Sequence, residues 1–108
     1  MKKLYSVLAL LIVAALVLSA CGGKAAGFKV GQVTDLGGID DKSFNAGAYQ
    51  GITKAITDLK VEGKYLESTQ QSDYAKNIQQ LLSENTNLII TVGFLLGVDT
   101  ATAAKANP

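Results

Sequence analysis

The sequence predicts an α/β fold in which a parallel sheet is flanked by helices. Short segments that are β-branched or that alternate apolar and polar residues predict strands over 28–33, 64–68 and 88–92. Apolar residues three and four positions apart predict helices over 43–60, from Ser72 onward, and from about 96 to 106. Strict alternation of strands and helices is typical of parallel sheets with helices on their faces.

The first twenty residues have the pattern of a secretory signal peptide. Lys2 and Lys3 precede an apolar run over 4–17, which is shorter than the roughly 20 residues of a membrane-spanning helix. The following Leu-Ser-Ala-Cys resembles the lipobox of bacterial lipoproteins, so we expect Cys21 to be lipidated as the first mature residue. A plain signal peptide or an uncleaved anchor are the alternatives. The Gly-rich segment 21–27 is typical of a flexible tether.

The first unit after the tether is a strand, a loop and a helix. The loop over 34–41 contains adjacent glycines and three aspartates. Asp41 or Ser43 can cap the helix over 43–60, because either side chain can accept free backbone N–H bonds of its first turn. The predicted buried stripe of this helix consists of Phe44, Ala48, Ile52, Ala55, Ile56 and Leu59.

The remaining elements follow the same pattern. Gly63 is expected to end the first unit, and Ser72 to cap the second helix. The buried stripe predicted there consists of Tyr74, Ile78, Leu81 and Leu82. The β-branched segment 88–92 is typical of a strand covered on both faces.

Composition excludes several classes of function. Beyond residue 20 the chain has eight lysines and nine acids, a net charge of −1, with no Arg or His and only Cys21. Phosphate contacts need clustered cations, so nucleic acid is not an expected partner. Zinc sites of the usual spacing, His-based triads and an intrachain disulfide are excluded as well. We expect no cofactor, no metal and no enzymatic activity.

The candidate site lies where the predicted strands end, since ligands of open parallel sheets bind beyond the carboxyl ends of the strands. The loop after the first strand lacks G-x-G-x-x-G and carries Asp40 and Asp41, which would repel a phosphate. Carboxylates accept hydrogen bonds from hydroxyl and amino groups, and an aromatic ring stacks on a base. An uncharged ligand therefore fits Asp35 and Phe44 better than a nucleotide does. An Asx turn for Asp35 and core packing for Phe44 are alternatives.

The run V-T-D-L-G-G-I-D-D-K-S-F-N over 33–45 resembles the opening signature of the basic membrane protein family. These lipoproteins include the purine nucleoside receptors of ABC transporters. The resemblance continues through Ala48, Gly51, the segment 72–74 and the segment 91–94.

The resemblance implies a type I periplasmic-binding-protein fold, with residues 28–108 as a partial first lobe. It implies that Phe44 stacks on the base, that Asp35 and Asn45 are polar pocket positions, and that Gly93 and Phe94 border the cleft. Implied partners are a nucleoside, an ABC permease and its ATPase subunits. The protein would be anchored by lipid on the extracytoplasmic face of the cell membrane. Members are about three times as long, so a fragment or a truncated gene product is expected.

Other functions remain open at this point. A sugar or another small polar solute could occupy the same fold, and Phe44→Ala would then spare binding. The chain could also be a truncated remnant, or a surface lipoprotein that binds macromolecules. Gly93 could simply relieve crowding at a strand end.

Overall fold

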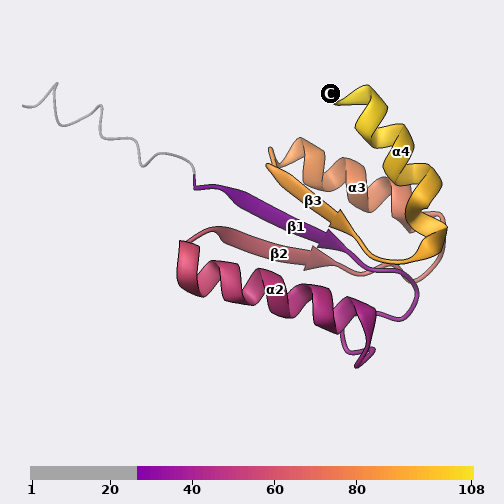
Figure 1. Cartoon of the computed structure of the whole chain (residues 1–108). Helices are drawn as coiled ribbons and strands as arrows, with labels where there is room; N and C mark the ends of the chain where they lie inside the picture. The colour runs from indigo at the N-terminus through magenta and orange to yellow at the C-terminus, as the bar shows by residue number, and fades with distance from the viewer. Residues whose placement is uncertain (1–26) are drawn as a thin grey trace, which may run out of the picture.

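The computed structural model describes residues 27–108, arranged as the sequence predicts (Figure 1). The predicted signal peptide, Cys21 and most of the predicted tether lie outside the described residues. The elements are β1 (Lys29–Val33), α2 (Phe44–Leu59), β2 (Glu62–Leu66), α3 (Asp73–Ser83), β3 (Leu88–Thr91), the 3-10 turn η1 (Phe94–Leu96) and α4 (Gly97–Ala106). None of the helices within residues 27–108 has both the length and the apolar character to cross a membrane.

The three strands form one parallel sheet in the order β2-β1-β3. Helix α2 lies on one face, while α3 and α4 lie on the other (Figure 1). The predicted α/β class with a parallel sheet and flanking helices is therefore confirmed. Because all three strands run the same way, their carboxyl ends meet at one edge of the sheet.

The main core lies between β1 and the helices α3 and α4. Its buried members are Val33, Tyr74, Ile78, Leu81, Leu96 and Ala103. The stripe predicted for α3 is confirmed, with Leu82 partly buried at its margin. Helix α3 comes very close to β1, because a Cβ on Gly31 would lie 2.7 Å from the Leu81 Cδ1 atom. Only glycine allows this separation at that position.

The second strand begins two residues earlier than predicted and includes Gly63. Gly63 faces α2, where an added Cβ would lie 2.6 Å from side-chain atoms of Ile52 and Ile56. The glycine therefore allows close helix packing inside β2 and, contrary to the expectation, does not end the first unit. Lys60 ends α2 instead, with a left-handed backbone at φ 58°. A lysine in that conformation gives no clear sequence signal.

Three smaller expectations are wrong. Ser72 makes no capping hydrogen bond through its side chain, and Asp73 instead accepts bonds from the N–H groups of Thr69 and Gln70. Strand β3 is not covered on both faces, because none of its four residues is buried and Leu88 is 47% exposed. The stripe of α2 is buried at Ile52, but its two ends, Phe44 and Leu59, are exposed.

Candidate functional site

The carboxyl edge of the sheet contains a hollow built from three segments. Its lining residues follow β1, begin α2 and follow β3: Asp35, Phe44, Val92, Gly93 and Phe94. We call this the carboxyl-edge hollow, and its volume is about 470 Å³. Four of the five predicted ligand residues line it, and Asn45 lies directly behind Asp35. Val92 is a lining residue that the sequence analysis missed.

Asp35 combines a structural role with an available acceptor. Its Oδ1 atom accepts hydrogen bonds from the Gly37 N–H at 3.0 Å and from the Asn45 Nδ2 at 2.7 Å. The Asx turn considered as an alternative is therefore present. Its Oδ2 atom accepts no hydrogen bond from residues 27–108. One carboxylate oxygen is thus fixed, and the other can accept from a ligand.

Gly93 lets the chain after β3 approach that carboxylate. Its φ is 123°, a conformation that side chains rarely allow. A Cβ there would lie 2.7 Å from both the Cβ and the Oδ2 atoms of Asp35. The glycine relieves crowding at a strand end, as one reading of the sequence suggested, and in doing so it forms part of the hollow.

Two aromatic rings of the hollow are open to solvent. The exposed fractions of Phe44 and Phe94 are 78% and 102%. Core packing, the alternative for Phe44, is therefore wrong. Phe44 stands at the start of α2, before the helix reaches its buried face, and Phe94 begins η1. Both rings can stack against a planar group without moving anything out of the core.

Asn45 is buried, with 1% of its surface exposed, and is held from three directions. Its Nδ2 donates to Asp35, its N–H donates to Asp41 Oδ2 at 2.9 Å, and its carbonyl accepts from Gln32 Nε2 at 2.9 Å. Its Oδ1 atom has no hydrogen-bond partner within the described part of the chain. The predicted polar position thus lies beneath the hollow.

Gln32 is a second buried polar residue, and the sequence analysis passed over it. It occupies β1 and is completely buried. The alternation of that strand places Gln32 on the same face as Val30, which is the face toward α2. A glutamine at an otherwise apolar inward position was the signal that could have identified it.

The loop before α2 is organised by carboxylates that cap or tie the backbone. Asp41 accepts three backbone bonds, from the N–H groups of Ser43, Asn45 and Ala46. The bond from Ala46 contributes most to lowering the pKa of Asp41 below its ordinary value, those from Asn45 and Ser43 add to it, and partial burial opposes them. Glu67 accepts from the Ile39 N–H at 2.7 Å and anchors the loop to the segment that directly follows β2.

The electrostatics of the hollow disfavour anions. Its lining contains one carboxylate, Asp35, and no cationic side chain. A phosphate there would meet a negative charge without compensation. Among residues 27–108, no group of three or more metal-ligating side chains is placed to hold an ion.

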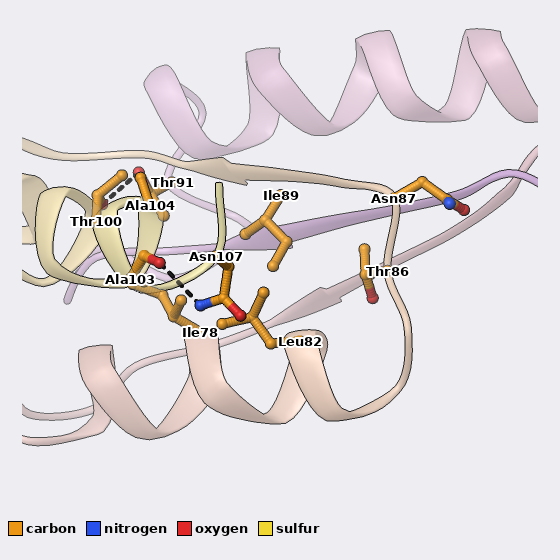
Figure 2. A pocket seen from close by; sticks show the side chains of 10 residues that line it. All are labelled: Ile78, Leu82, Thr86, Asn87, Ile89, Thr91, Thr100, Ala103, Ala104 and Asn107. Carbon is orange, nitrogen blue, oxygen red and sulfur yellow. Dashed lines mark hydrogen bonds between the residues drawn. The ribbon is translucent and has the colours of Figure 1, made fainter.

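A second depression lies on the face of the sheet that carries α3 and α4 (Figure 2). Ile78, Leu82, Ile89 and Ala103 supply its apolar wall, and Thr91 and Thr100 share a hydrogen bond at one end. Its lining contains no charged group and no aromatic ring. The carboxyl-edge hollow is therefore the better equipped of the two for specific recognition.

Comparison with known proteins identifies related sequences along the whole described part. Residues 28–108 match the family model for PnrA-like ABC transporter substrate-binding proteins. A CD4+ T-cell-stimulating antigen from Listeria innocua is 34% identical over 100% of this chain and 35% of its own length. The ABC transporter nucleoside-binding protein BmpA from Lactococcus lactis is 31% identical over 99% of this chain and 34% of its own length. An uncharacterized lipoprotein from Pyrococcus abyssi is 35% identical over 88% of this chain and 26% of its own length.

A solved structure has the same arrangement. A solute-binding protein of an ABC transporter system from Aeropyrum pernix superposes with a TM-score of 0.65 at 26% identity. The match covers 73% of this chain and 22% of that one. The chain therefore spans about a third of the length of the first two relatives above and matches part of a solute-binding protein.

Proposed function

The chain belongs to the family of PnrA-like ABC transporter substrate-binding proteins, and from this membership we propose that it captures nucleosides, with purine nucleosides as the preferred ligands, for import. Proteins of this family bind a solute and do not change it chemically. The observation that carries the nucleoside assignment is the composition of the carboxyl-edge hollow. It offers one carboxylate oxygen, on Asp35, that accepts no hydrogen bond from the described residues, beside two solvent-open rings, Phe44 and Phe94.

Each part of the hollow corresponds to a part of such a ligand. A base can stack on the exposed ring of Phe44, which already stands clear of the core. The Oδ2 atom of Asp35 can accept a hydrogen bond from an N–H, amino or hydroxyl group. The absence of a cation from the lining favours nucleosides over nucleotides.

The partners and the location belong to the same proposal. Residues 28–108 would form part of the first lobe of a type I binding protein, which delivers its ligand to an ABC permease driven by ATPase subunits. The leader pattern and Cys21 favour a lipid anchor on the extracytoplasmic face of the cell membrane. The name lipoprotein carried by the Pyrococcus abyssi relative supports that location.

The test is an NMR titration of the chain with guanosine, inosine, adenosine, ribose and guanosine monophosphate. We expect saturable shifts at Asp35, Phe44, Gly93 and Phe94 with the nucleosides, and weaker ones with ribose and the monophosphate. Phe44→Ala should reduce nucleoside affinity about 5- to 150-fold, because one base stack contributes about 1–3 kcal/mol.

Phe28→Ala is the matched control, since Phe28 is 53% exposed and precedes β1 at the opposite end of the strand. Nucleoside affinity should be the same with and without this change. Equal shifts with ribose and guanosine, unaffected by Phe44→Ala, would favour the sugar alternative. A folded chain that responds to no nucleoside would refute the ligand assignment.

A further inference from the structure

We propose that Gln32 is a positioning residue of the carboxyl-edge hollow, which sets where Phe44 and Asn45 stand relative to Asp35. The proposal rests on the nucleoside-binding function stated above. Gln32 itself does not line the hollow. It acts through hydrogen bonds that run from the carboxyl half of β1 through Asn45 to Asp35.

The connection consists of two short bonds with Asn45 between them. Gln32 Nε2 donates to the Asn45 carbonyl at 2.9 Å inside the protein. Asn45 Nδ2 then donates to Asp35 Oδ1 at 2.7 Å. Gln32 thus ties the first turn of α2 to the same strand whose end carries Asp35.

The hydrogen bonds through Asn45 fix the position of Phe44, which core packing does not fix. The Phe44 ring has 78% of its surface exposed, so few core contacts fix its place. Phe44 immediately precedes Asn45, whose backbone is held by Gln32 from one side and by Asp41 from the other. A shift of this turn would move the ring relative to Asp35, and a site loosened by about 1 Å loses much of its affinity.

Within the described residues, only one of the two polar groups of the Gln32 side chain makes a hydrogen bond. Its Oε1 atom is buried without a hydrogen-bond partner in the described residues, as is the Asn45 Oδ1 atom. A buried polar atom without a partner is destabilising, and an apolar side chain of equal size removes that cost. Helix α2 also does not need Gln32 to begin, because Asp41 accepts the N–H groups of Asn45 and Ala46 in its first turn and that of Ser43 just before it.

The experiment compares Gln32→Met with the unaltered chain, because methionine keeps the length of the side chain but cannot donate. Guanosine affinity is measured by NMR titration and stability by urea unfolding. We expect affinity to fall about tenfold, while the unfolding midpoint stays the same or rises. Gln79→Met, at an exposed position of α3, should change neither quantity. A merely structural role would lower the midpoint together with the affinity.

A double variant tests whether Gln32 acts through the aromatic wall. In a Phe44→Ala background, Gln32→Met should cause little further loss, because residues that act as one unit are not additive. Full additivity, or an unchanged affinity of the single Gln32→Met variant, would overturn the positioning role. If the unaltered chain binds no nucleoside, the proposed function fails instead, and the two failures are therefore distinguishable.

Discussion

Gly93 is a position at which both the backbone conformation and the packing of the candidate site require glycine. Its positive φ and its contact with Asp35 each exclude a side chain. We expect Gly93→Ala to destabilise the fold by about 1–3 kcal/mol, because the backbone becomes strained and the new methyl group overlaps the carboxylate. Urea unfolding of the variant measures this change.

Gly97→Ala is the control for Gly93→Ala. Gly97 begins α4 with ordinary helical angles, and an added Cβ would meet nothing within 4 Å. This change should be neutral or stabilising by up to about 1 kcal/mol, since alanine favours helix. Equal stability of the two variants would show that the approach of Gly93 to Asp35 is not tight in solution.

Single residues of the site could be predicted from the sequence to different degrees. Asp35 and Phe44 could be proposed from the sequence, because a carboxylate two residues after a strand and an aromatic at a helix start lie at the edge where ligands bind. The sequence could not predict that Asp35 would use one carboxylate oxygen for structure and leave the other available in the hollow. The Asx turn was one of the alternatives for Asp35, whereas its bond to Asn45 depends on how the loop folds back, which no local pattern specifies.

At the scale of elements, one carboxylate, that of Asp41, caps the start of helix α2. Asp41 accepts three backbone bonds at its start, chiefly the one from Ala46 that lowers its pKa below the ordinary 3.8. A carboxyl group with a lowered folded pKa contributes stability above its unfolded pKa and loses it as the pH falls through the folded pKa. We therefore expect Asp41 to make the chain less stable below about pH 4.

Urea unfolding between pH 2 and pH 7 tests this dependence. Asp41→Asn should lower stability at neutral pH and flatten the acid-dependent part of the profile. Asp40→Asn serves as the control, because the Asp40 carboxylate accepts no hydrogen bond from the described residues, and the profile should keep its shape. An Asp41→Asn profile that still falls as steeply would assign the acid sensitivity to other carboxylates.

The order of the elements could be predicted, while some of their boundaries could not. The hydrophobic periodicity, which alternates between that of a strand and that of a helix, predicted all three strands and the three α-helices. The sheet has the expected parallel strands. Gly63 was misassigned because a glycine for close helix packing and a glycine for a turn look alike in sequence. The exposure of Leu88 depends on the width of the layer that α2 covers, which is a property of the tertiary arrangement.

At the scale of the whole molecule, β1 holds the sheet together. It is hydrogen-bonded to β2 on one side and to β3 on the other. We expect the amides of β1 to exchange with solvent most slowly, because their exposure requires both neighbours to separate. The outer strands should exchange faster, and hydrogen exchange followed by NMR measures the difference. Protection in β2 greater than in β1 would contradict this arrangement.

The hollow is lined by residues that follow β1 and β3, so it can form only after both strands are present. Asp35 and Gly93 are 58 positions apart in the chain, so the early part of a nascent polypeptide carries the loop and the first aromatic ring without their far wall. Contacts between segments so distant form late, after the entropy of closing a long loop has been overcome. The carboxyl-edge hollow is consequently completed only when synthesis has passed β3.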